Sequence, residues 1–211
     1  MKEYLNNRLC LVEFIWENAP MKSYGDVVLI LTAVLSACAA WRWPGKRKDR
    51  ERFIRLLTEY SLPEHHVEWI CIPALVNDGI LSESETPYHN DAGRIFTDEE
   101  IDLSPDNARI KYPSLTEEQL GKHSYASLLY EYLRCGYAHE YKSHESTSPW
   151  PATNRATRIS YICEKGSRFE NITRKICFHL DYLFSVAEYH VTILPEEQPD
   201  KSKPSGTGEQ T

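Results

Sequence analysis

The 211-residue chain lacks the short motifs by which several large enzyme classes are recognised. It has no glycine-rich phosphate loop, no Gly-x-Ser-x-Gly nucleophile elbow and no set of kinase motifs. No internal repeat is found either. The sequence therefore predicts none of those three chemistries, and any activity must be sought in other side chains.

Paired cysteines and a secretory leader are also missing. The six cysteines are far apart with no Cys-x-x-Cys pair, and Lys2, Glu3 and Arg8 interrupt the segment where a signal peptide would be apolar. We expect a reduced, cytoplasmic protein. The cysteines are Cys10, Cys38, Cys71, Cys135, Cys163 and Cys177.

No apolar run is long enough to predict a membrane span. Residues 27–41 carry no charge, but a helix of that length reaches only about 22 Å, against roughly 30 Å for the hydrocarbon core. A buried core helix is expected there, and no membrane partner. The net charge of -7 argues against a surface that coats nucleic acid as a whole, but not against a local basic site.

Apolar residues at helical spacing predict an all-α domain over residues 1–194. One such pattern ends at Trp43-Pro44, another joins Phe53 to Tyr60, a third leads from Tyr125 to Arg134, and a final helix is expected from Ile172 to Leu194. Residues 159–163 suit one short strand. An irregular insertion is expected at 77–113, with room for one short β-hairpin around Gly93, and a disordered tail at 195–211.

Arg134 and His139 are the candidate catalytic residues. A guanidinium binds phosphate at any physiological pH, and an imidazole moves protons near neutrality. Five positions of an unbroken α-helix separate two side chains by about 140°. We therefore expect either a bend at Gly136 or a second copy of the chain to bring the pair together. Arg174 and His179 share the spacing, but His179 is expected on the apolar face of the final helix as a core residue.

The segment Leu133-Arg-Cys-Gly-Tyr-Ala-His-Glu140 resembles the signature of the HEPN superfamily (higher eukaryotes and prokaryotes nucleotide-binding domains), an arginine followed at short spacing by a histidine. Residues 24–60 and 123–190 resemble it more loosely. The resemblance implies a HEPN-like helical bundle that forms a homodimer and cleaves RNA without metal or cofactor, in a toxin–antitoxin or anti-phage defence setting. It implies catalytic roles for Arg134 and His139, and an antitoxin or nucleotidyltransferase as partner.

The densest basic stretch lies between Arg42 and Arg55. Within it Lys46, Arg47 and Arg50 are the candidate RNA-binding residues, since clustered cations can follow a phosphate backbone. The alternative interpretation is a solvated helix start.

Two further functions stay open. Cys135 stands where the resemblance leads one to expect a polar residue, and cysteine is a weak hydrogen-bond partner. The alternative function is therefore a catalytically inactive HEPN-like protein that binds a partner or a nucleotide. Alternatively, the chain is a helical interaction module in which Arg134 forms an ion pair with Glu131 or Glu140. Cys135, His139 and His144 do not complete a tetrahedral ligand set, so no metal site is predicted.

Overall fold

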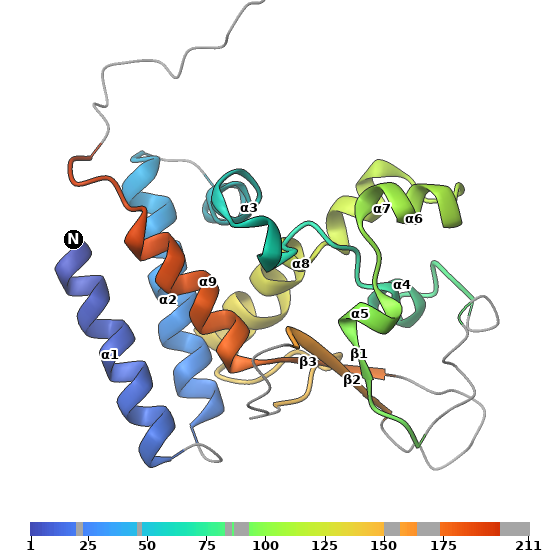
Figure 1. Cartoon of the computed structure of the whole chain (residues 1–211), viewed down its shortest axis with the longest axis horizontal. Coiled ribbons are helices and arrows are strands. Elements are labelled where there is room, and N and C mark those ends of the chain that lie inside the picture. Colours follow the sequence, from blue (N-terminus) through green and yellow to red (C-terminus); the bar gives the residue numbers. More distant parts are fainter. Residues whose placement is uncertain are drawn as a thin grey trace, which may run out of the picture.

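Helix α2 (Tyr24–Arg42) is the central helix of the protein. In the computed structural model, which describes residues 1–19, 23–45, 48–82, 86, 93–149, 157–163 and 174–198, four helices pack around it. Figure 1 shows α1, α2 and α9 side by side at one end of the molecule. The four packing helices are α1 (Lys2–Asn18), α3 (Asp49–Tyr60), the π-helix η3 (Leu129–Glu140) and α9 (Leu180–Thr192).

The position of α2 follows from its sequence. A helix with apolar residues on all sides is stable in water only when neighbours cover it, and Val28, Leu31 and Cys38 are completely buried. The helix ends at Arg42, directly before Trp43-Pro44, as expected. By length and composition alone α2 could cross a membrane. Its packing against four other helices confirms the prediction of a core helix.

The insertion predicted at 77–113 contains regular elements between residues 96 and 111, so the expectation of an irregular segment was wrong for that part. Helices α5 (Asp98–Ile101) and α6 (Pro105–Lys111) lie there, each opened by a side-chain cap from Thr97 or Ser104. Both are too short to show an apolar period. The other short helices are η1 (Pro63–His65), α4 (Ile72–Asn77), α7 (Glu117–Lys122) and α8 (Tyr125–Leu128).

A three-stranded antiparallel sheet adds to the helices, so the fold is mainly helical rather than all-α. Strands β1 (Phe96–Thr97), β2 (Ile159–Cys163) and β3 (Arg174–Phe178) pair in that order. The final helix was predicted to begin at Ile172, but residues 174–178 form β3 and α9 begins at Leu180. Strand β1 pairs with distant β2, rather than with a local partner around Gly93.

The predicted tail falls mostly outside the described residues, which end at 198. Its first residue, Pro195, accepts a hydrogen bond from the Trp41 indole at 3.0 Å. The described chain therefore remains attached to α2 past the end of α9, and the disorder predicted from 195 was wrong for that residue.

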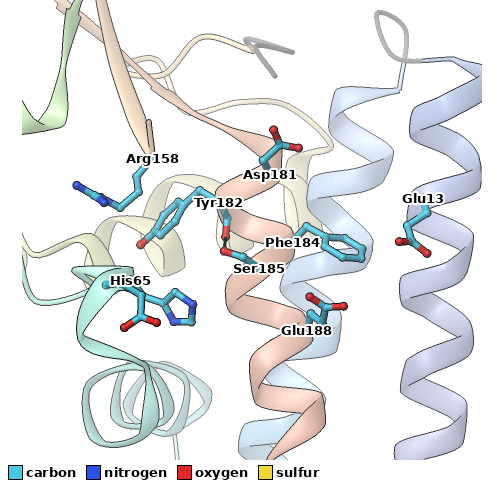
Figure 2. Close-up of a pocket in the computed structure, with 9 residues that line it drawn as sticks. Glu13, His65, Arg158, Asp181, Tyr182, Phe184, Ser185 and Glu188 are labelled. Atoms are coloured by element: carbon cyan, nitrogen blue, oxygen red, sulfur yellow. Dashed lines mark hydrogen bonds between the residues drawn. The ribbon is translucent and has the colours of Figure 1, made fainter. Parts of the chain in front are cut away.

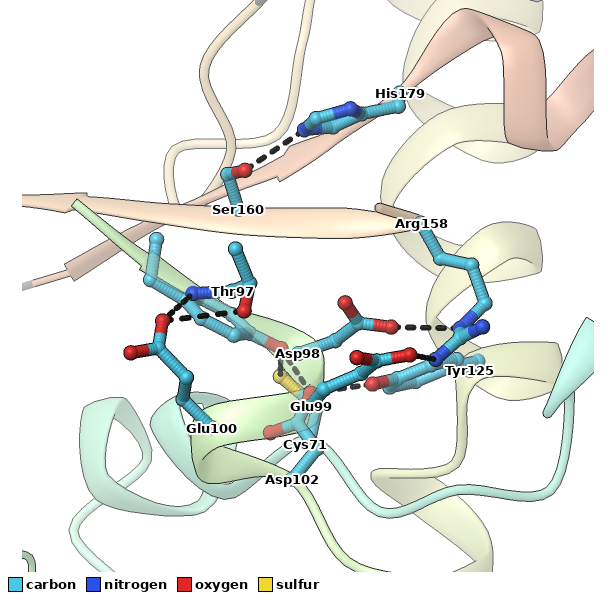
Figure 3. Close-up of polar contacts among 11 residues, drawn as sticks. Cys71, Thr97, Asp98, Glu99, Glu100, Asp102, Tyr125, Arg158, Ser160 and His179 are labelled. Atoms are coloured by element: carbon cyan, nitrogen blue, oxygen red, sulfur yellow. Dashed lines mark hydrogen bonds and ion pairs between the residues drawn. The ribbon is translucent and has the colours of Figure 1, made fainter. Parts of the chain in front are cut away.

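A buried carboxyl group joins the sheet to the small helices (Figure 3). Asp102 accepts hydrogen bonds from the Ile72 backbone N–H at 2.9 Å, from the Tyr125 hydroxyl at 2.5 Å and from the Tyr161 hydroxyl. Burial raises the pKa of Asp102 to about 7, although these three donors act in the opposite direction. The Asp102 network therefore ties α4, α8 and β2 to one titrating group.

We predict that Asp102 makes the protein less stable as the pH rises from about 5 to 8. An exposed aspartate has a pKa of about 3.9, so the folded state keeps a proton that the unfolded chain has already released. The resulting stabilisation is complete below that value and is lost as the pH rises through about 7. Thermal unfolding of Asp102→Asn should show a flatter pH dependence than wild type, and exposed Asp106→Asn should match wild type. Parallel wild-type and Asp102→Asn curves would contradict this assignment.

Candidate active site

The candidate site lies on one face of η3, whose π-helical geometry determines which side chains meet. A π-helix closes its backbone hydrogen bonds over five residues rather than four, so residues five apart lie on the same face. Two such pairs are in contact. The side chains of Tyr130 and Cys135 interact electrostatically, and Arg134 contacts His139 with 3.2 Å between Nη1 and Nε2.

The contact between Arg134 and His139 determines which ring nitrogen of the neutral imidazole carries the proton. A guanidinium has donors only, so Nε2 of His139 must accept and the ring proton of the neutral form lies on Nδ1. His139 is exposed, and about a fifth of the Arg134 side chain is exposed. The pair is thus accessible from solvent, with an unprotonated nitrogen beside a cation.

Neither a bend at Gly136 nor a second copy is needed for this contact, so that expectation was wrong. The helix continues through Gly136 and ends at Glu140, followed by Tyr141 in the left-handed conformation. Gly136 has a different role. A Cβ there would lie 2.8 Å from the backbone oxygen of Lys142, so only glycine lets the chain after η3 return this closely.

Asp49 orients Arg134, a role that the sequence did not reveal. Its Oδ2 lies 2.7 Å from Nη2 of Arg134, and the guanidinium carbon stands 5.5 Å from the centre of the Tyr130 ring. Asp49 is the first residue of α3. Cys135, which directly follows Arg134 in the chain, interacts instead with Tyr130. A carboxylate 85 positions away in the sequence carries no local signal.

The basic stretch between Arg42 and Arg55 is largely paired within the protein. Arg50 lies 2.5 Å from Glu131 of η3, and Arg55 lies 2.6 Å from Glu59. Lys46 and Arg47 fall outside the described residues. Of the three candidate RNA-binding residues, the structure therefore places Arg50 alone, beside η3 and already in an ion pair.

A cavity of about 320 Å³ opens beside His139. Its lining combines η3 with the segment that follows it, and its formal charges come from Lys142 and three glutamates. Lys142 lies 2.7 Å from Glu140, so the two opposite charges compensate each other. The lining residues are Glu131, Cys135, Gly136, His139, Glu140, Lys142, Ser143, His144 and Glu145.

A larger cavity, about 640 Å³, lies over α9 and is not part of this site. Figure 2 shows carboxylates of Glu13, Asp181 and Glu188 around it, with Arg158 at one end. Arg158 is engaged by Asp98 at 2.7 Å. Neither Arg134 nor His139 lines this larger cavity, so size alone does not identify the candidate site.

The second pair at the same spacing does not form a site. Arg174 lies in β3 and His179 precedes α9, and both are buried. His179 is hydrogen-bonded to the Ser160 hydroxyl at 2.8 Å (Figure 3). His179 is a core residue, as expected, although it occupies the N-cap position of α9 instead of lying within the helix. Among the described residues, no three His, Cys, Asp or Glu side chains gather as metal ligands.

No protein family, curated protein or solved structure matches the chain. The candidate function therefore depends on the geometry of the site and on the resemblance of residues 133–140.

We predict that Gly136→Ala disturbs the site while Gly121→Ala does not. The new methyl group at 136 would meet a backbone oxygen that cannot rotate away, at a cost of about 1–3 kcal/mol in the free energy of unfolding. A Cβ added at Gly121, in α7, would meet no atom within 4 Å outside the backbone of its own helix, and alanine should stabilise the helix by about 0.5–1 kcal/mol. Urea unfolding of the two variants measures the difference. Equal effects of the two substitutions would refute the close approach at Gly136.

Proposed function

We propose that the protein is a metal-independent endoribonuclease of HEPN type, with Arg134 and His139 as its catalytic residues. The observation that carries the proposal is the 3.2 Å contact between the two side chains on an exposed face of η3. A cleaving site must hold a phosphate and accept a proton within the same few ångströms. These two groups meet both needs within a single protomer.

The 2′-hydroxyl of RNA is a nucleophile already held next to its own phosphate. Nε2 of His139 takes the hydroxyl proton, the 2′-oxygen bonds to phosphorus, and the bond from phosphorus to the 5′-oxygen breaks. Arg134 donates paired hydrogen bonds to the phosphate oxygens, where negative charge builds in the transition state. When Arg134 turns its N–H from His139 to the phosphate, the lone pair on Nε2 becomes free. The leaving 5′-oxygen takes a proton from water and His139 returns its proton to the solvent, so the products are a 2′,3′-cyclic phosphate and a 5′-hydroxyl.

The proposal includes the setting that the resemblance implies. The protein acts in the cytoplasm as a toxin or anti-phage nuclease, forms a homodimer and is restrained by an antitoxin or a nucleotidyltransferase. Arg50 binds RNA next to η3, and Lys46 and Arg47 are further RNA-binding residues. Exposure of His139 and its neighbouring cavity support access by a large substrate.

The competing function is a catalytically inactive HEPN-like protein that binds a partner or a nucleotide. Ion pairs favour it, because the cations of the site are already compensated. Arg134 pairs with Asp49 and Arg50 with Glu131, so a phosphate must displace or share these carboxylates. The module in which Arg134 pairs with Glu131 or Glu140 is disfavoured, because Glu140 lies against Lys142.

We predict RNA cleavage in excess chelator by wild type, and a loss of about 10²–10⁴-fold in kcat for His139→Gln. Arg134→Lys keeps the charge but loses the paired donors, and should also be strongly impaired. The control is Arg109→Ala, which removes an exposed arginine of α6. All variants are purified identically, and the products are tested for cyclic phosphate ends. Cleavage that His139→Gln and Arg134→Lys leave unchanged would assign the activity to a contaminant and remove the proposed function.

We further predict that Asp49→Asn lowers kcat by roughly 10-fold, a smaller loss than His139→Gln causes. The amide keeps an oxygen for Arg134 but loses the charge that holds the guanidinium in place. Exposed Glu59→Gln, at the other end of α3, gives the matched loss of a carboxylate. An Asp49→Asn enzyme with wild-type kcat would show that the ion pair does not orient Arg134.

A further inference from the structure

A second imidazole lines the cavity that His139 lines. His144 belongs to the return segment, residues 141–149, which follows η3 and passes over Gly136. Its ring lies flat on the ring of Tyr132, with 4.1 Å between the ring centres and 7° between the planes. The stacking limits rotation of the imidazole, so His144 presents a defined edge.

Backbone contacts determine which nitrogen of His144 carries the proton. The N–H of Ser146 donates to Nδ1 at 3.1 Å, so Nδ1 accepts and the proton of the neutral ring lies on Nε2. The neutral ring of His139 has the opposite tautomer, because its Nε2 accepts from Arg134. One cavity is thus lined by an imidazole that accepts at Nε2 and by another that carries a proton there.

The return segment is held in place at both ends. Thr147 donates to the carbonyl oxygen of His144 through its N–H at 2.9 Å and its hydroxyl at 2.8 Å. Ser146 and Ser148 bond to Ile176 of β3, at 2.8 and 3.1 Å. Against η3, the segment lies close to Gly136. Such a group is preorganised, which is what a donor to a developing charge requires.

We propose that His144 is a third catalytic residue, which donates its Nε2–H to a non-bridging oxygen of the scissile phosphate. The proposal rests on the proposed ribonuclease function. In this role Nδ1 of His144 stays occupied by the Ser146 N–H, and Nε2 is the donor. His144 transfers no proton, and it stabilises the charge that forms as the 2′-oxygen attacks. Arg134 and His144 then hold the phosphate while His139 accepts the proton.

The test compares His144→Leu and His144→Gln on a short RNA with a single cut site. Leucine removes the donor and should lower kcat by about 10²–10³-fold, as does loss of one oxyanion donor elsewhere. Glutamine offers an amide N–H at a similar reach and should recover at least a tenth of wild-type kcat. Because the proposed donor transfers no proton, leucine should lower kcat without removing a limb of its pH profile. Ser148→Ala, in the same segment but outside the cavity lining, should retain wild-type kcat.

Three outcomes overturn the inference, and they are distinguishable. Wild-type RNA cleavage that needs His139 but is unchanged in His144→Leu rejects His144 alone and leaves the proposed function intact. Loss in His144→Leu that removes only one limb of the pH profile shows that His144 transfers a proton and is no neutral donor. A wild-type protein that cleaves no RNA removes the proposed function and the inference with it.

Binding of a substrate with a 2′-methoxy group at the cut site, measured in parallel, should be nearly equal in wild type and His144→Leu.

Discussion

The five-residue closure of hydrogen bonds in η3 is the constraint on which the candidate site depends. In an α-helix Arg134 and His139 would point in different directions, whereas in the π-helix they touch. Tyr130 and Cys135, a pair that begins four residues earlier, show the same five-residue spacing. Such helices are rare and frequently occur at functional sites. The geometry therefore gives a reason within one protomer for an arginine and a histidine at this spacing.

The rest of the fold supports η3 from three directions. Helix α2 supplies the apolar surface on which it packs, and the first turn of α3 brings Asp49 and Arg50 against its polar face. Strand β3 anchors the return segment, which places His144 over Gly136. The sheet is thereby connected to the site, although none of its strands lines the cavity beside His139. Substitutions in β3 should therefore be judged by their effect on that segment as well as on the core.

Local patterns predicted the parts of the protein whose causes are local. The charge-free run before Trp43-Pro44 identified α2, and the spacing from Phe53 to Tyr60 identified α3. The four-residue spacing of Ile172, Ile176 and Leu180 fits a helix, yet pairing with β2 made residues 174–178 a strand. Arg134 and His139 were selected as candidate residues from their chemistry, and the structure places their side chains in contact. Asp49 could not be assigned, because its partner is close only after folding.

The tautomer of His139 tests the central claim most directly, since it reports the Arg134 contact without any assay of activity. Nitrogen NMR of the imidazole in its neutral form distinguishes a proton on Nδ1 from one on Nε2. The geometry predicts the Nδ1–H form in wild type, and a shift towards the more common Nε2–H form in Arg134→Ala. An Nε2–H form in wild type, unchanged by Arg134→Ala, would show that the two side chains do not meet and would contradict the account.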